Sequence, residues 1–149
     1  MVYMKKVLFL FMIVLLTACG GSGEEKEETE ETKQTYEINE EFEFDYGNLD
    51  LELQNIYVED GELKFGIWWK HWATNDKIHF EYFAHVKVEQ NGEALERIDD
   101  NDSTLKQIEK GVIGKVELEY QLKDDSPISI EVFTLGEDQE SHTIEVELD

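Results

Sequence analysis

The only cysteine of the chain, Cys19, stands where a thiol could be modified during export. Upstream, Lys5 and Lys6 form a short positive segment, and residues 7–16 follow without one polar side chain. A charged segment followed by an apolar one is the layout of a secretion signal. These ten apolar residues are fewer than the roughly 20 that a membrane-spanning helix needs. The pattern therefore predicts a cleaved signal peptide over residues 1–18.

The run Leu16-Thr17-Ala18-Cys19 resembles the lipobox of bacterial lipoproteins. That resemblance implies a diacylglyceryl thioether on the sulfur of Cys19, and cleavage that makes Cys19 the new N-terminus. It also implies a location at the cell membrane, lipid-anchored and facing the extracytoplasmic side. The alternative is an ordinary cysteine close to a standard cleavage site.

Three tryptophans within residues 68–72 form the second candidate site. Side chains alternate along a strand, so if Trp69 faces inward, then Trp68, Lys70 and Trp72 face outward. Two aromatic plates beside a cation could bind an acidic group of a sugar or a peptide, or anchor a protein partner. The alternative is that Trp68 and Trp72 pack under a loop or across strands.

Histidines suggest a metal site only weakly. On one strand, His79 and His85 would share a face but lie about 20 Å apart, which is too far for joint ligation. A site that combines His71 with one other histidine would still need further nitrogen, sulfur or carboxylate ligands. We expect all four histidines, including His142, to be solvated strand residues, and we expect no bound metal.

The acidic run from Asp99 to Ser103 loosely resembles a calcium loop. Thr104 and Lys110 stand where that loop needs glycine and glutamate, so a plain solvated loop is the favoured interpretation over weak calcium binding. The sequence contains no nucleophile motif of a known hydrolase class, so we expect neither catalysis nor a cofactor.

The charge of the chain restricts its partners. The formal net charge is −23, and removal of residues 1–18 takes it to −25 because two lysines and no acid are lost. Such a surface repels nucleic acid and anionic lipid headgroups. We therefore expect no nucleic-acid binding, and contact with the membrane through the lipid on Cys19 alone. With one cysteine, an intramolecular disulfide cannot form.

Residues 19–35 have the composition of a linker. After Cys19 they contain no hydrophobic residue, and glutamate dominates. Such a segment cannot bury enough apolar surface to offset its ordering entropy, so we predict a disordered Glu-rich linker. A helix built on glutamate and lysine is the alternative, but it would lack an apolar face to pack.

Residues 36–149 alternate apolar and polar side chains, which is the signal of half-buried antiparallel strands. The predicted strands cover, in order, residues 36–44, 49–58, 63–69, 78–88, 116–122, 128–132 and 144–148. The pairs Asp60-Gly61 and Asn91-Gly92 favour tight hairpin turns. A change of phase near Gln54 and Asn55 predicts a β-bulge. Seven or eight short strands in one domain predict a β-sandwich, with at most one or two helical turns at residues 103–109.

Several segments resemble an immunoglobulin-like domain found on lipoproteins of low-GC Gram-positive bacteria, a domain of unknown function. The resemblance is carried by residues 88–95 (VEQNGEAL), 108–111 (IEKG), 116–122 (VELEYQL) and 125–132 (DSPISIEV). It implies an immunoglobulin-like antiparallel β-sandwich and transfers no catalytic residues. The family usually carries a polar Asn/Ser-rich loop after the third strand, whereas residues 68–76 here read WWKHWATND.

Two classes of function remain open. In the favoured one, the chain is a lipoprotein with a non-catalytic binding domain for an envelope protein, a peptide or a glycan. In the alternative, it is an accessory or regulatory subunit of a cell-envelope protein complex. A hydrolase is the third class and has the least support, since no nucleophile has a base partner in the sequence.

Overall fold

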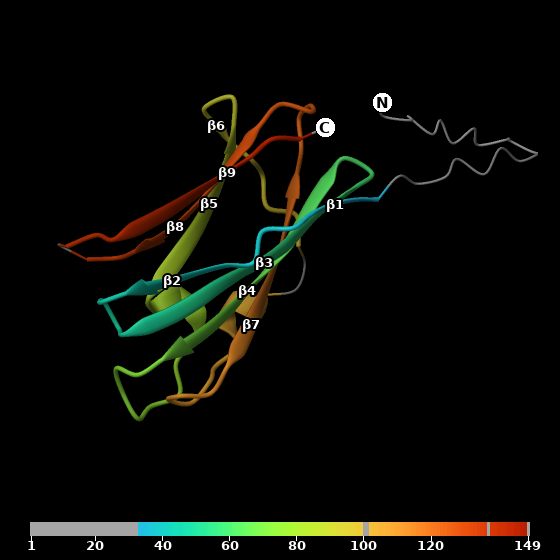
Figure 1. Ribbon diagram of the computed structural model, residues 1–149. Coiled ribbons are helices and arrows are strands. Elements are labelled where there is room, and N and C mark those ends of the chain that lie inside the picture. The colour runs from blue at the N-terminus through green and yellow to red at the C-terminus, as the bar shows by residue number, and fades with distance from the viewer. Residues whose placement is uncertain (1–32, 100–101, 137, 149) are drawn as a thin grey trace, which may run out of the picture.

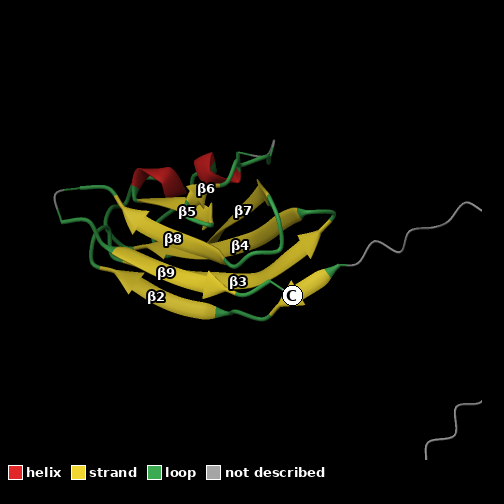
Figure 2. Cartoon of the chain, turned by 90° about the horizontal axis from the view of Figure 1, so that it is seen from above, coloured by secondary structure: helices red, strands yellow, loops and turns green. Residues whose placement is uncertain are grey.

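The computed structural model describes residues 33–99, 102–136 and 138–148. The predicted signal peptide, Cys19 and the linker up to residue 32 lie outside these residues. Two antiparallel sheets pack face to face, as the views in Figures 1 and 2 show. The prediction of an all-β sandwich is confirmed.

The first sheet has the order β1-β3-β4-β7, with β2 beside β1 on the same edge of β3. Its strands are β1 (Gln34–Tyr36), β2 (Glu40–Phe44), β3 (Leu49–Glu59), β4 (Glu62–His71) and β7 (Gly114–Gln121). The second sheet has the order β6-β5-β8-β9. Its strands are β5 (Ala84–Gln90), β6 (Glu93–Ala94), β8 (Ile128–Thr134) and β9 (Ser141–Val146). Two 3₁₀ turns, η1 (Phe80–Tyr82) and η2 (Ser103–Leu105), lie in the connections.

The core lies between the sheets and is built by the period-two pattern of the strands. Inward positions of the first sheet, such as Leu53, Ile67 and Leu118, are fully or almost fully buried. Ile130 and Val132 of the second sheet are equally buried and face them. Alternate positions point to solvent and carry mostly charged side chains. The outer face of each sheet is therefore polar unless the sequence departs from this pattern.

The predicted turns and the predicted bulge are confirmed. Asp60 and Asn91 adopt φ angles of 54°, and each is followed by a glycine that also has positive φ. Both pairs close hairpins, β3–β4 and β5–β6. The register of β3 against β4 shifts between Leu53 and Ile56. That shift lets both of these residues face the core although they are an odd number of positions apart.

The predicted strand over residues 78–88 is wrong in its first half. Phe80 begins the 3₁₀ turn η1, and β5 starts only at Ala84. Residues three apart align on one side of a 3₁₀ turn, so Phe80 and Phe83 are both buried while Tyr82 is exposed. Alternation alone could not distinguish this turn from a strand, because the hydrophobic residues satisfy both patterns.

Two boundaries also differ from the predicted ones. The predicted first strand is split at Asn39, whose φ is 47°, into β1 and β2. The linker was expected to reach residue 35, but Gln34 and Thr35 belong to β1 and pair with Val58 and Tyr57. Backbone pairing with β3 orders these polar residues, which composition alone does not predict. In the described part of the chain no helix is long and apolar enough to cross a membrane.

We expect Leu118→Ala to lower the free energy of unfolding by about 2–4 kcal/mol, because the truncation leaves a cavity in the core. Leu118 is 1% exposed and lies in the central part of β7. Chemical denaturation measures the change. Leu105→Ala is the matched control, since Leu105 is 47% exposed and its truncation should cost less than about 0.5 kcal/mol. Equal losses in both variants would contradict the core described above.

Candidate functional site

Trp68 lies on the outer face of the first sheet. Its neighbours in β4, Ile67 and Trp69, are buried in the core, so the alternation of the strand directs Trp68 outward. Trp68 is 41% exposed, and Trp72, just past the end of β4, is 44% exposed. Neither tryptophan is a buried core residue, but Trp72 does pack against Gly111 of a loop and reaches Asp50 across the strands, as the alternative interpretation held for it.

Trp72 and Lys70 converge on Asp50 of β3, and we refer to these three residues as the Asp50 cluster. The indole Nε1 of Trp72 donates a hydrogen bond of 2.9 Å to Oδ2 of Asp50. The same oxygen lies 3.1 Å from Nζ of Lys70, which in turn lies 4.9 Å from the ring centroid of Trp72. The cation that we expected to be free for a ligand is thus already paired within the chain.

The Asp50 cluster lowers the pKa of the Asp50 carboxyl group. The hydrogen bond from Trp72 has the largest effect; partial burial acts in the opposite direction, and the contact with Lys70 lowers the pKa further. A carboxyl group with a lowered pKa in the folded state stabilises the fold above its unfolded pKa. That contribution is lost as the pH falls through the folded pKa.

A groove of about 610 Å³ crosses the outer face of the first sheet from β2 to β4. We call it the acidic groove, because the part of the chain that the structure describes lines it with four carboxylates and one cation, that of Lys70. Cross-strand register explains the clustering: Glu41 of β2 faces Glu52 of β3, and Glu43 faces Asp50. Trp68 faces Glu52 from the other side, at the end of the groove.

A second groove, of about 500 Å³, lies on the other side of Trp68, and we call it the lysine groove. Lys77, Lys106 and Lys115 line it, and Glu109 is the only acidic residue among the described residues of its lining. Nζ of Lys77 lies 3.1 Å from Oε1 of Glu109. Trp68 and Ile113 line both grooves and separate them, and we call this pair the Trp68–Ile113 ridge.

The segment that presents Ile113 is fixed by two glycines. Gly111 adopts a φ of 73°, and a Cβ atom there would lie 3.0 Å from the ring of Trp72. A Cβ atom at Gly114 would lie 2.7 Å from Nε1 of Trp69. Between them, Val112 and Ile113 are exposed, and 58% of Ile113 is accessible to solvent. The sequence contains a signal for this exposed apolar segment, since Val112 and Ile113 stand side by side between two glycines and break the alternation of apolar and polar residues.

The structure corrects the prediction for the histidines. His71 is fully buried rather than solvated, because it continues the inward phase of Ile67 and Trp69 in β4. Its Nε2 lies 3.3 Å from the carbonyl oxygen of Ile108. His142 is surface-located and lies 2.7 Å from a carboxylate oxygen of Glu40. No group of three or more histidine, cysteine or acidic side chains in the described residues is arranged to hold a metal.

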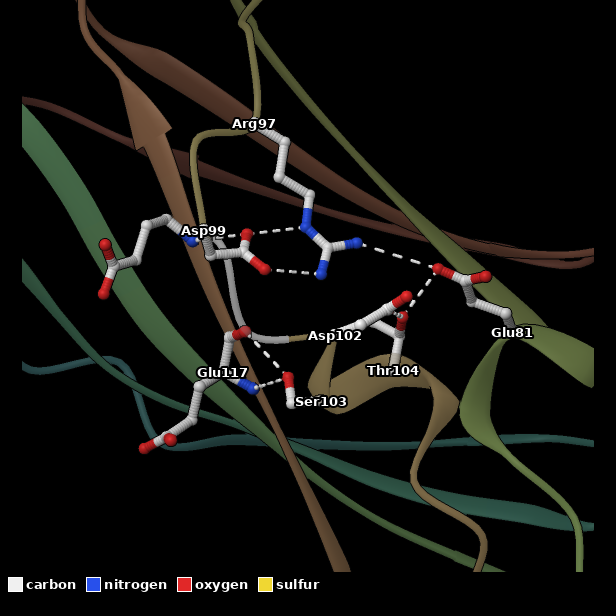
Figure 3. Close-up of polar contacts among 8 residues, drawn as sticks. Glu81, Arg97, Asp99, Asp102, Ser103, Thr104 and Glu117 are labelled. Carbon is white, nitrogen blue, oxygen red and sulfur yellow. Dashed lines mark hydrogen bonds and ion pairs between the residues drawn. The ribbon is translucent and has the colours of Figure 1, made fainter.

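We expected the run from Asp99 to Ser103 to be a plain solvated loop, but its described acids contact other protein groups (Figure 3). Asp99 accepts two hydrogen bonds of 2.6 Å from Arg97, whose guanidinium lies 3.7 Å from Glu81. Burial raises the pKa of Asp99, but hydrogen bonds from Arg97 and from the backbone of Glu119 outweigh it, so the net pKa is lowered. Asp102 accepts a hydrogen bond from the hydroxyl of Thr104. Residues 100 and 101 lie outside the described part.

Ser103 attaches the same segment to the edge of β7. Its hydroxyl donates to the carbonyl oxygen of Glu117 at 2.9 Å and accepts from the amide of Glu117 at 2.8 Å. Both backbone groups of Glu117 are thereby satisfied without a further strand. Asp99, Ser103 and their neighbours therefore have a structural role, which is to hold this segment against the edge of β7.

The family assignment follows from comparison with known proteins. A family model described as "Domain of unknown function (DUF5067)" matches residues 24–133, more than half of the chain. The chain belongs to the DUF5067 family. The matched range of this DUF5067 member includes the Asp50 cluster and every residue that lines the two grooves. No curated protein and no solved structure matches the chain significantly.

We expect Trp72→Phe to raise the pKa of Asp50 toward its ordinary value, because phenylalanine keeps the ring and loses the donor. A pH titration of the side-chain carboxyl carbon by NMR measures the shift. The matched control is Trp68→Phe, because the indole of Trp68 donates no hydrogen bond to Asp50 and its loss should leave that pKa unchanged. An unaltered titration of Asp50 in Trp72→Phe would contradict the assigned hydrogen bond.

Proposed function

We propose that this DUF5067 protein is a membrane-anchored extracytoplasmic lipoprotein whose folded domain is a non-catalytic interaction module. The lipobox-like run that ends at Cys19 supports the anchor, and its position before a Glu-rich segment supports a tether between the lipid and the domain. The candidate partners are an envelope protein, a peptide or a glycan.

The observation that carries the proposal is the Trp68–Ile113 ridge. Its two side chains are 41% and 58% exposed, and the exposed Val112 directly precedes Ile113. Contiguous exposed apolar surface, flanked by polar residues, marks interaction sites more often than inert surface. Tryptophan is also the residue type most enriched among the anchors of protein interfaces.

The placement of the ridge relative to the N-terminus also supports this function. Gln34 of β1 pairs with Val58, whereas Trp68 pairs with Glu52, six residues away along β3. Six residues of strand span about 20 Å, so the ridge lies well away from the end where the chain enters the domain. In Figure 1 the described chain enters beside the β3–β4 hairpin, opposite the loop that follows β4. A tether at that end would leave the ridge accessible.

Strand order supports an immunoglobulin-like classification of the sandwich. We infer that β4 and β7 correspond to strands B and E, and that β5, β6, β8 and β9 correspond to C, C′, F and G. With β3 as strand A, the two sheets then read A-B-E and C′-C-F-G, which are pairings of the immunoglobulin type. Such domains serve many functions, so the fold alone does not select a ligand.

The accessory-subunit alternative uses the same surface in another way. A self-sufficient binding module would hold its ligand when isolated, whereas an accessory subunit would act only together with a neighbouring envelope protein. The ridge and its two oppositely charged grooves suit a protein surface better than a small ligand, since none of the three features is an enclosed cavity.

We expect Cys19→Ala to abolish lipid labelling and to release the protein from membranes, because the thioether can form only on the sulfur of Cys19. Metabolic labelling with a fatty-acid analogue and membrane fractionation measure both effects. Cys19→Ser is a second variant of nearly the same size and should behave alike. A Cys19→Ala protein that is still processed and membrane-bound would contradict the lipid anchor.

We expect a photo-reactive benzoylphenylalanine in place of Ile113 to form a covalent adduct in intact cells, because a partner would cover the ridge. Immunoblotting for a shifted band and mass spectrometry of the adduct provide the measurement. The control places the same group at Leu135, which is exposed on the β8–β9 connection and lines neither groove. Absence of any adduct at position 113 would contradict the assignment of this face.

A further inference from the structure

We propose that the partner of the Trp68–Ile113 ridge is a second copy of this chain, bound in a two-fold symmetric dimer. The proposal rests on the proposed function above, in which this face is an interaction surface, and it names the occupant. It follows from the distribution of charge on the two sides of the ridge.

The two grooves have opposite charge. The acidic groove is lined by Glu41, Glu43, Asp50 and Glu52 against Lys70, which gives a formal charge of −3. The lysine groove is lined by Lys77, Lys106 and Lys115 against Glu109, which gives +2 for the lining residues. Lys77 is paired with Glu109, and Lys115 is paired at 2.7 Å with Glu117 beside the groove, so Lys106 carries the unpaired positive charge. A local excess of lysine is unexpected in a chain of net charge −23 with only 13 basic residues.

Several of these charges are available for a partner. Within the described residues, the carboxylates of Glu41 and Glu43 and the ammonium of Lys106 have no ion-pair partner and no side-chain hydrogen bond. Both acids lie on the outward positions of β2, and both are exposed. Unpaired charges of opposite sign on the two sides of one apolar ridge can be matched in a single contact.

Symmetry makes this surface complementary to itself. When two copies meet through the same face, the two-fold axis lies in the plane of contact. If that axis runs along the ridge, rotation places the acidic groove of the first copy over the lysine groove of the second. The lysine groove of the first copy then lies over the acidic groove of the second. The two ridges meet at the axis, where Trp68 and Ile113 of both copies become buried.

The same axis agrees with attachment to one membrane. The grooves follow one another across the strand order β2, β3, β4 and β7, and the ridge between them passes obliquely from β4 to the residue before β7, more along the strands than across them. Rotation about an axis parallel to the strands preserves strand direction. Both copies then have β1, and the tether before it, at the same end. Two chains anchored side by side in one membrane could therefore form this dimer, and anchoring raises their effective concentration.

Other occupants match only part of the face. A basic peptide would pair with the acidic groove and leave the lysine groove unmatched, and an anionic glycan would have the opposite mismatch. The large net charge opposes association of two copies, but charges separated by more than about 8 Å are screened at physiological ionic strength. The dimer would bring the charges of the two grooves closer than this, so their attraction would be screened less than the repulsion between distant charges.

The experiment exchanges the charges of the two grooves in the full-length lipidated protein, purified in a non-ionic detergent. One variant, Glu41→Lys/Glu43→Lys, makes the acidic groove basic. The other, Lys106→Glu/Lys115→Glu, makes the lysine groove acidic. Native mass spectrometry over a concentration series counts the copies in each complex and distinguishes a mixed dimer by its mass.

We expect the wild-type protein to form a dimer, and each variant alone to dissociate about tenfold more readily or worse, since like charges then face one another. An equimolar mixture of the two variants should recover the wild-type affinity as a mixed dimer. Trp68→Ala should weaken the dimer without changing its charge. Controls with the same change in net charge, Glu131→Lys/Glu145→Lys and Lys87→Glu/Lys123→Glu, lie outside both grooves and should dimerise like the wild type.

Three results would overturn the dimer. The first is a wild-type protein that stays monomeric at submillimolar concentration. The second is an equimolar mixture of the two groove variants that does not recover the wild-type affinity. The third is a control variant that weakens the dimer as much as the groove variant with the same change in net charge. If the adduct at position 113 has the mass of another molecule while the purified chain is monomeric, the interaction surface stands and the dimer is wrong. If neither an adduct nor a dimer forms, both proposals fail.

Discussion

The burial of Trp69 is the constraint on which the rest of this face depends. Its indole fills the space above Gly114, where a Cβ atom would lie 2.7 Å from Nε1. It also contacts the ring of Phe80 edge-on, at 5.6 Å between centroids. One side chain thus connects β4 with β7 and with the turn η1. Because neighbouring side chains of a strand point to opposite faces, fixing Trp69 inward also fixes Trp68 and Lys70 outward.

Glycine at position 114 has a second consequence. It allows β7 to begin close to Trp69, and the residues just before it, Val112 and Ile113, are then left on the surface beside Trp68. The core and the exposed ridge are therefore two results of the same packing. A change that moved Trp69 would displace both, which is why the proposed tests alter Trp68, Ile113 and the groove charges instead.

The first sheet also illustrates how an antiparallel sandwich protects its edges. The free side of β7 is occupied by the segment that contains Arg97 and Ser103, whose side chains bind Asp99 and the backbone of Glu117 (Figure 3). Satisfied edge groups do not recruit a foreign strand. The acidic run that loosely resembles a calcium loop therefore has a structural explanation at the β7 edge.

Much of the fold was determined by the sequence itself, because period-two alternation and turn chemistry are local properties. They were enough for the sandwich, the Asp60-Gly61 and Asn91-Gly92 hairpins and the bulge after Leu53. They also placed Trp68 on an outer face. The lipobox-like run at Cys19 is likewise a local pattern, and it lies outside the described residues. Local patterns did not predict the 3₁₀ turn that begins at Phe80, because a turn and a strand at this place would both bury aromatic residues.

Only the tertiary structure decided which charges surround Trp68. Glu41, Asp50, Lys70 and Lys115 come from four different strands, and their neighbourhood depends on strand order and register. Strand order is set by the packing of the two sheets and cannot be read from any single segment. The pairing of Lys70 with Asp50, and the separation of an acidic groove from a lysine groove, are for that reason properties of the fold alone.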